Sequence, residues 1–320
     1  MKIVFQHSGI LPVKKYGGIE RILFWHMVEL AKRGHSVVLF GHKDSQVEEF
    51  GIELRPDSLN WVREVPSDAD IIHLTYNFLP KCDVPTLINI QGNGQIGEEF
   101  PVNTVFVSRK HAENHGSSCF IYNGIDLEEY PFIKESKDEI NHLMFLAKGS
   151  WSVKNLKHCI ELAKKTKKHL HIAGGKAWLP SRYITSYGMV GGEEKLNILK
   201  KCDALLFPVR WHEPFGIAII EAMAMGLPVF GSPYGSLPEL ITRETGKVFS
   251  SKKEMIAFFL NGPDRYDCLK IRKYVEEYFT ISRLTDDYLK LYEKVLKGQD
   301  LNEKPPMWNL SCAPLNLLDF

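Results

Sequence analysis

Residues 213–229 read EPFGIAIIEAMAMGLPV, a stretch apolar enough to be buried that nevertheless contains two carboxylates, Glu213 and Glu221. Burying a carboxylate is costly unless another group pairs with it. A core helix with acidic residues at its solvated ends would account for Glu213, which precedes Pro214. It accounts less well for Glu221, whose neighbours are apolar. The pattern therefore favours two carboxylates directed into a cleft, where they could bind several hydroxyl groups of a ligand.

The composition is that of an ordinary globular protein. A length of 320 residues favours two domains, and the apolar and charged fractions of 44% and 25% are average. The 40 basic and 39 acidic side chains leave a net charge of +1, so no overall field attracts nucleic acid. The six cysteines contain no CxxC pair, which favours reduced thiols and disfavours a zinc site or a disulfide framework.

No segment of the sequence is predicted to cross a membrane. The chain begins with a strand-like run, Lys2 to Phe5, rather than an apolar signal region. Its longest apolar segment, residues 215–231, is interrupted by Glu221 and Pro228. We expect a cytoplasmic location, and the sequence leaves open a peripheral contact with the inner face of a membrane.

The N-terminal part alternates between strands and helices. A strand at residues 2–5, a helix at 19–32 and a strand at 36–40 predict a parallel sheet, which binds ligands at the carboxyl ends of its strands. Gly17 and Gly18 lie in the loop after the first strand, where backbone N–H groups could approach an anion. A plain turn is the alternative for this glycine pair.

Two motifs resemble ligand sites without meeting their requirements. Asp68-Ala69-Asp70 could hold a divalent metal, but it precedes a buried strand and so faces the wrong end of a parallel sheet. We interpret it as the solvated start of that strand. Residues 92–97, GNGQIG, fit the dinucleotide fingerprint, yet Pro101 shortens the following helix, and the strand at 104–107 ends in Ser108 rather than an acid. We predict a glycine loop at the carboxyl edge of the sheet, with a dehydrogenase as the alternative.

A charged segment, residues 134–139, is predicted to link the two domains. A second alternating series follows, with a strand at 142–146, a helix at 156–168 and a strand at 169–173. Lys148 and Lys154 flank its first loop at a helix start. This arrangement suits a diphosphate, because two positive charges and backbone dipoles converge on it. Ordinary surface lysines are the alternative.

The rest of the chain continues the same alternation. Further strands are predicted at 204–208 and 228–230, and further helices at 193–201, 253–261, 266–279 and 283–296. The last twenty residues contain three prolines and several apolar side chains, and they could form an ordered strap on one domain or support a dimer. The sequence has no HExxH metal motif, no GxSxG elbow, no Walker loop and no clear internal repeat.

With these residues in view, the chain resembles the retaining glycosyltransferases of family four over nearly its whole length. The E-x7-E block from Glu213 to Glu221, continued to Val229, is the most specific match. Supporting matches are Gly17-Gly18-Ile19-Glu20, Gly34-His35, Asn123-Gly124-Ile125-Asp126 and the segment from Tyr278 to Tyr292. The resemblance implies the α/β GT-B fold, in which two doubly wound, Rossmann-like domains face each other across a cleft. They would be an acceptor-side domain, residues 1–134, and a nucleotide-sugar-binding domain, residues 139–280, with a helix at about 281–298 crossing back to the first domain and a tail at 299–320.

The resemblance also implies roles for individual residues. Glu221 would bind the ribose hydroxyls of the nucleotide, and Glu213 the donor sugar. Lys154, together with Lys148, would bind the diphosphate. The remaining donor contacts would come from the backbone: Gly17 and Gly18 near the diphosphate and the acceptor, Gly188, Met189 and Val190 at the base, and Phe215, Gly216 and Ile217 at sugar hydroxyls or phosphate.

Two departures from the family pattern concern the chemistry. The family usually has an arginine five residues before its phosphate-binding lysine, whereas Lys148 precedes Lys154 by six, which implies a local insertion and a non-bidentate contact. The family commonly has a histidine after the strand that ends in Ile90, where this chain has Gln91. A glutamine can hydrogen-bond a sugar but cannot exchange a proton near neutral pH, which argues against an acid–base role. Gln91 nevertheless joins Glu213, Lys154 and Lys148 as a catalytic candidate.

The activity implied by the resemblance is transfer of a sugar from a nucleoside diphosphate, UDP-sugar first and GDP-sugar second, to a hydroxyl group with retention of configuration. The acceptor would be a glycan, a lipid-linked molecule or a small molecule in bacterial-type glycan or glycoconjugate synthesis. We expect no metal, no cofactor and no nucleic acid partner, and the oligomeric state is left open. The alternatives are an epimerase or phosphorylase of the same fold, or a catalytically weak sugar-nucleotide-binding protein.

Overall fold

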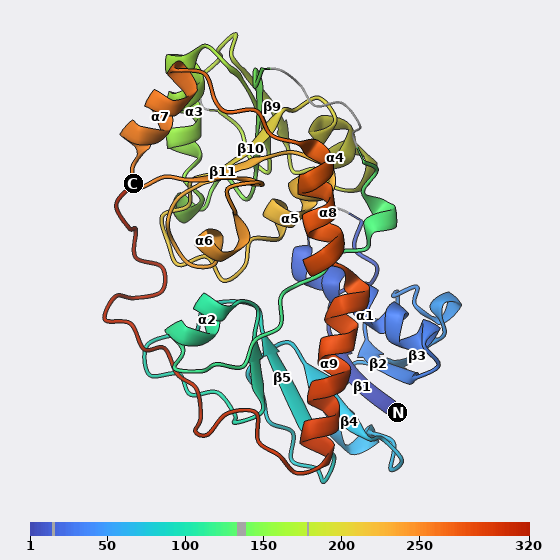
Figure 1. Ribbon diagram of the computed structural model, residues 1–320. Coiled ribbons are helices and arrows are strands. Elements are labelled where there is room, and N and C mark those ends of the chain that lie inside the picture. The colour runs from blue at the N-terminus through green and yellow to red at the C-terminus, as the bar shows by residue number, and fades with distance from the viewer. Residues whose placement is uncertain (15–16, 133–138, 178) are drawn as a thin grey trace. The chain divides into compact units, whose positions relative to one another are not determined.

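The computed structural model describes residues 1–14, 17–132, 139–177 and 179–320. The chain divides into two compact units (Figure 1). Within the described residues, the first unit comprises Met1–Val13, Gly17–Ile125 and Thr280–Ser311, and the second comprises Lys14, Asp126–Phe279 and Cys312–Phe320. The linker predicted at 134–139 lies almost wholly outside the described residues.

The first unit is built on a six-stranded parallel sheet in the order β3-β2-β1-β4-β5-β6. Every residue of β4, β5 and β6 is buried, as expected for strands covered on both faces. The strand order reverses between β1 and β4, where the carboxyl ends of a doubly wound sheet leave room for a ligand. The strands are β1 (Lys2–His7), β2 (Ser36–Gly41), β3 (Ile52–Pro56), β4 (Ile71–Leu74), β5 (Thr86–Ile90) and β6 (Thr104–Phe106).

Two long helices, α1 (Gly18–Lys32) and α9 (Ile281–Leu296), lie side by side in the first unit (Figure 1). The buried residues of α9 recur every three or four positions, which is the spacing of one helix face. The Thr280 side chain accepts a hydrogen bond from the Arg283 amide and caps the start of α9. The shorter elements are α2 (Arg109–Asn114), η1 (Glu48–Phe50) and η2 (Trp61–Glu64).

The second unit has a six-stranded parallel sheet in the order β12-β11-β10-β7-β8-β9. Counted along the chain, this is the same arrangement as in the first unit, with the reversal between β7 and β10. Both sheets therefore have the parallel strands that the alternating sequence pattern predicts and the doubly wound order that the resemblance implies. The strands are β7 (His142–Leu146), β8 (His169–Ala173), β9 (Ile184–Gly188), β10 (Ala204–Phe207), β11 (Val229–Gly231) and β12 (Gly246–Val248).

Helices lie on both faces of the second sheet (Figure 1). On one face α3 (Leu156–Thr166) packs against α7 (Lys252–Leu260), and their apolar residues share a core with β7, β8 and β10. On the other face α5 (Ile217–Ala224) packs against α8 (Cys268–Tyr278). The remaining elements are α4 (Gly192–Leu199), α6 (Leu237–Leu240), η3 (Leu127–Glu129) and η4 (Ser152–Lys154). Every helix within the described residues is too short or too polar to span a bilayer.

The last twenty residues form a strap that contacts both units, whereas the sequence suggested a strap on one domain or a part in a dimer. In the first unit Trp308 is buried, and the Met307 amide donates to the His115 carbonyl. In the second unit the Leu318 amide donates to the Arg210 carbonyl at 2.8 Å, and Phe320 packs on the core beside α3 and α7. The strap thus divides between the two units instead of forming one separate tail.

Both misleading motifs have the structural roles expected of them. Asp70 accepts a hydrogen bond from the Lys2 amide at 2.6 Å, and Asp68 pairs with the Lys2 ammonium at 2.6 Å, at the amino edge of the first sheet. Residues 92–97 form a loop after β5, and the Gly94 amide donates to His115 Nε2 at 2.9 Å. The loop does not lead into a helix, as a dinucleotide site would require.

The backbone at Gly124 lies close to the backbone at Thr280, just before α9, and a substitution of Gly124 can test this contact. A Cβ atom on Gly124 would lie 2.3 Å from the Thr280 carbonyl oxygen, whereas one on Gly92 would meet nothing within 4 Å. We expect Gly124→Ala to lower the free energy of unfolding by about 1–3 kcal/mol, the usual cost of overpacking. The matched variant Gly92→Ala should change it by less than about 0.5 kcal/mol. Thermal unfolding of both variants checks this, and equal melting temperatures would contradict the contact.

Candidate functional site

The loop at residues 148–155, here called the lysine loop, and the E-x7-E block follow neighbouring strands of the second sheet. β7 and β10 are adjacent and parallel, and the strand order reverses between them. The loop after β7 leads through η4 to Lys154, and the loop after β10 leads to Glu213. Because the carboxyl ends of parallel strands meet at one edge, the topology brings both loops to the place where doubly wound sheets bind ligands.

Lys154 and Glu213 form a buried ion pair between these two loops. Lys154 Nζ lies 2.6 Å from Glu213 Oε2, and the two side chains are only 12% and 7% exposed. Trp211 Nε1 donates to the same carboxylate oxygen at 2.6 Å, and its ring centroid lies 4.8 Å from Lys154 Nζ. The resemblance implies that Lys154 binds phosphate and that Glu213 binds the donor sugar. Because the two side chains are in direct contact, a ligand that binds one of them would also change the position and the electrostatic environment of the other.

The backbone around Glu213 is fixed by the loop before α6. The Ser236 amide donates to the Glu213 carbonyl at 2.9 Å, and the Ser236 hydroxyl donates to the Phe215 carbonyl at 2.7 Å. Gly235 has a φ of 63°, and a Cβ there would lie 2.2 Å from the Glu213 carbonyl oxygen. Gly216, with a φ of 87°, then turns the chain into α5, which begins at Ile217. The loops before α5 and α6 therefore each require a glycine, Gly216 and Gly235, to place Glu213 beside the first amides of α5.

Lys148 is exposed on the same lysine loop and differs from Lys154 in its surroundings. Its ammonium lies 5.3 Å from the ring centroid of Trp151. The Trp151 ring in turn lies 6.3 Å from the Trp211 ring. The lysine loop thus carries one buried lysine, one exposed lysine and the indole ring of Trp151, and Trp211 approaches from the loop after β10. The exposed ammonium of Lys148 is open to an anionic ligand.

Glu221 lies within α5 and is also satisfied by a lysine. Lys195 Nζ, from α4, donates to Glu221 Oε1 at 2.6 Å, and the two side chains are 8% and 9% exposed. The Tyr130 hydroxyl donates to the same oxygen at 2.5 Å. Lys195 Nζ is also 3.2 Å from the Tyr130 hydroxyl. The second carboxylate is therefore held in position from two sides by donors of the same unit.

The predicted base-binding backbone lies at the same edge of the sheet. Gly188 ends β9 with a φ of 74°, and its carbonyl accepts a hydrogen bond from the Gly174 amide at 2.6 Å. The Gly174 carbonyl accepts from the Gly149 amide at 2.7 Å, which ties this backbone to the lysine loop. Met189 is 46% exposed, whereas Val190 is buried.

Gly17, Gly18 and Gln91 belong to the first unit, and the other predicted site residues belong to the second. Gly17 precedes α1 with a φ of 148°, and Gly18 is the first residue of that helix. The Gln91 side chain exchanges two hydrogen bonds with the Asn123 amide, at 2.9 and 3.1 Å. Its amide nitrogen also donates to Asn89 Oδ1 at 2.5 Å. Gln91 is thus held in one orientation at the carboxyl edge of its sheet.

Three contacting residues escaped the sequence reasoning, namely Trp211, Lys195 and Tyr130, whereas Asn123 was noted in a supporting motif without a role in the site. Trp211 stands two residues before Glu213, and that proximity was the available signal. Lys195 lies in the helix predicted at 193–201, where no local pattern marked it as buried. The cost of burying Glu221 did indicate that some partner was needed, but it could not indicate which one. Among the described residues, no group of three or more His, Cys, Asp or Glu side chains is arranged to hold a metal ion.

Residues 141–259 match the family model described as glycosyl transferases group 1. The match covers less than half of the chain and lies within the second unit. The matched segment contains the lysine loop, α4 and the whole E-x7-E block, that is, both buried ion pairs. The resemblance to glycosyltransferases stated from the sequence is therefore confirmed.

Individual relatives agree with this assignment. A probable sucrose-phosphate synthase of Thermosipho melanesiensis is 38% identical over 86 residues, which is 26% of this chain and 20% of that protein. The curated relatives are matched over only 16% to 24% of their own length.

Solved structures resemble the chain over most of its length. AviGT4, a glycosyltransferase involved in avilamycin A biosynthesis, has a TM-score of 0.74 and 19% identity, with 93% of this chain and 98% of that chain covered. Anabaena HepE in complex with UDP and glucose has a TM-score of 0.65 and 14% identity, with 92% and 100% covered. These similarities confirm the GT-B fold.

The pair between Lys195 and Glu221 can be tested by removing the cation. Lys195→Met would leave a buried carboxylate without a counterion, and we expect a loss of about 3–5 kcal/mol in the free energy of unfolding. Lys200→Met, at an exposed position just after the same helix, should cost less than about 0.5 kcal/mol. The double variant Lys195→Met/Glu221→Gln should recover much of the loss, because no buried charge remains. Urea unfolding of the three variants checks this; a single variant as stable as the wild type would contradict it.

Proposed function

We propose that this protein is a glycosyltransferase that moves a sugar from a nucleoside diphosphate to an acceptor hydroxyl with retention of configuration. UDP-sugars are the first candidate donors and GDP-sugars the second. The observation that carries the proposal is the pair of buried carboxylates, Glu213 and Glu221, each 2.6 Å from a lysine. The family match over the same residues, and the UDP and glucose in the HepE complex, support this donor class.

The chemical demand is to stabilise the diphosphate as it leaves with increasing negative charge. Preorganised cations and helix-terminal amides meet that demand without reorganising during the reaction. Lys148, the amides of Phe215, Gly216 and Ile217, and Lys154 would have this role. An ammonium has three donors, so Lys154 could keep its bond to Glu213 while it binds a phosphate oxygen.

The two carboxylates would bind different parts of the donor. Glu221 would accept hydrogen bonds from the ribose hydroxyls through the oxygen that Lys195 and Tyr130 do not occupy, and the backbone at Gly188–Val190 would lie at the base. Glu213 would bind the sugar, so the donor sugar and the phosphate-binding Lys154 would be coupled through one ion pair. Substitutions at Glu213 would then change both donor choice and turnover.

We propose a front-face route in which the leaving phosphate takes the proton of the acceptor hydroxyl. The carboxylates of the block are engaged with lysines, and Gln91 cannot exchange a proton near neutral pH. The lysine cations would neutralise the diphosphate, and the reaction is proposed to need neither a metal ion nor a cofactor. The acceptor would be a glycan, a lipid-linked molecule or a small molecule.

A thermal-shift screen against UDP, GDP and ADP, their sugars and the free nucleosides tests the proposal. A ligand at 100 times its Kd stabilises the folded protein by about 2.7 kcal/mol. We expect one nucleoside diphosphate and its sugar to raise the melting temperature, and the matching nucleoside, which lacks the diphosphate, to raise it less. If none of them shifts the transition, the proposed donor class is wrong. Binding without release of the diphosphate in the presence of glycans would favour the sugar-nucleotide-binding alternative.

A further inference from the structure

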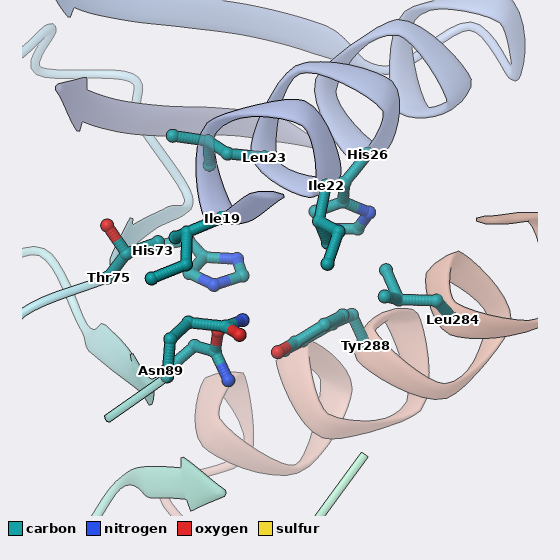
Figure 2. A pocket seen from close by; sticks show the side chains of 10 residues that line it. Ile19, Ile22, Leu23, His26, His73, Thr75, Asn89, Leu284 and Tyr288 are labelled. Atoms are coloured by element: carbon teal, nitrogen blue, oxygen red, sulfur yellow. The ribbon is translucent and has the colours of Figure 1, made fainter. Parts of the chain in front are cut away.

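A small pocket in the first unit lies at the carboxyl edge of its sheet, outside the lysine loop and the E-x7-E block. It is enclosed by the start of α1, the ends of β4 and β5, and α9 (Figure 2). Its volume of about 10 Å³ is roughly the room that one water molecule or one hydroxyl group needs. The lining residues are Ile19, Ile22, Leu23, His26, His73, Thr75, Asn89, Gln91, Leu284 and Tyr288.

His73 presents an unsatisfied nitrogen to this pocket. The residue is 3% exposed, and its Nε2 is buried without a hydrogen-bond partner among the described residues. A buried polar atom of this kind calls for an explanation, because native structures rarely leave one unpaired. Burial lowers the pKa of His73 to about 3, so the imidazole is neutral at ordinary pH. Figure 2 shows its ring directed towards the middle of the pocket.

The other nitrogen of His73 belongs to a buried chain of hydrogen bonds. His73 Nδ1 is 2.6 Å from the Tyr292 hydroxyl, which is 2.9 Å from His26 Nε2. His26 Nδ1 is 2.9 Å from the Thr285 hydroxyl. Tyr292 has one proton, so it donates to one histidine and accepts from the other. If it donates to His73, then Nε2 carries a proton into the pocket; if it accepts, Nε2 is a bare acceptor.

A hydroxyl group is the ligand that suits both states. It can accept from Nε2–H in one tautomer and donate to Nε2 in the other, so the chain never leaves His73 without a partner. The hydroxyl of Tyr288 also points into the pocket, as Figure 2 shows. Within the described part of the chain this hydroxyl makes no hydrogen bond, although Tyr288 is only 3% exposed and its ring centroid lies 4.8 Å from that of His73. Two polar atoms thus face the same small volume.

The pocket excludes charged ligands on physical grounds. None of its lining side chains carries a charge at neutral pH, and Ile19, Ile22 and Leu23 of α1 and Leu284 of α9 form apolar walls. An anion or a cation would therefore be buried without a counterion, at a cost that its hydrogen bonds do not repay. Neutral groups that both donate and accept hydrogen bonds meet no such penalty.

We propose that this pocket binds one hydroxyl group of a neutral, sugar-like ligand, with His73 Nε2 and the Tyr288 hydroxyl as its hydrogen-bond partners. His73 is a positioning residue here rather than a base. The source of the hydroxyl, which rests on the proposed function, is either the acceptor or the sugar of the donor. The amides of Gln91 and Asn89 line the same volume and are fixed by their bond to each other, so they would orient the ligand further.

Nitrogen NMR of the full chain labelled with ¹⁵N-histidine tests the proposal without any assay of transfer. The His73 signals are assigned by their loss in His73→Asn, and the probes are the methyl α-glycosides of glucose, galactose and mannose. We expect at least one of these probes to move the His73 Nε2 signal, and acetate at equal concentration to leave it unchanged. A parallel titration with UDP-glucose distinguishes the sources, because a response to the nucleotide sugar alone assigns the hydroxyl to the donor.

Tyr288→Phe supplies the matched variant, since it removes one hydroxyl and keeps the ring. It should weaken binding of the responding probe about fivefold, the value of one neutral hydrogen bond, whereas Tyr278→Phe on the surface of the second unit should not. His73 signals that stay unchanged with every glycoside and with UDP-glucose, or that respond equally to acetate, would overturn the proposal. Because the probes need no turnover, this result is independent of whether nucleoside diphosphates shift the melting temperature.

Discussion

The buried ion pair between Lys154 and Glu213 joins the two loops on which the candidate site depends. It connects the loops after β7 and β10 across the point where the strand order reverses, with both side chains almost fully shielded from water. A buried pair of this kind contributes little net stability, but removing one partner is expensive. The pair therefore fixes the positions of the two segments. If the lysine loop and the E-x7-E block moved apart, each charge would have to become exposed to water or remain buried without a counterion.

The ion pair between Lys195 and Glu221 holds the other end of the E-x7-E block. Glu221 receives Lys195 and Tyr130 from segments before α5, so the carboxylates at the two ends of the block are held by different parts of one unit. The first unit offers contrasting chemistry, a small uncharged pocket lined by His26 and His73, which Tyr292 joins in a chain of hydrogen bonds that ends at His73 Nε2, unpaired among the described residues. Charged groups suit a diphosphate and ribose, and uncharged groups suit an isolated hydroxyl.

Much of the architecture could be predicted from the sequence, because hydrophobic runs and glycine loops are local signals. The strands at 142–146 and 169–173 coincide with the predicted ones, and the helix boundaries differ by at most about two residues. The partners of the site could not be predicted in this way. Lys195 and Tyr130 reach Glu221 only through tertiary packing, and a surface lysine has no sequence mark that distinguishes it from a buried one. The histidine chain is likewise assembled from α1 and β4 together with α9, which lies more than two hundred residues further along the sequence.

The central claim is that the paired carboxylates hold a nucleoside diphosphate, and calorimetric titration of UDP and GDP into wild-type protein and Glu221→Gln tests it most directly. Glutamine keeps an acceptor for Tyr130 but removes the charge that a ribose hydroxyl would meet. The account predicts that the better nucleotide binds Glu221→Gln at least about tenfold more weakly, as expected for loss of a charge-assisted hydrogen bond. Glu244→Gln, at an exposed position of the same unit, should bind as the wild type does. Equal affinities in the wild type and Glu221→Gln would contradict the account.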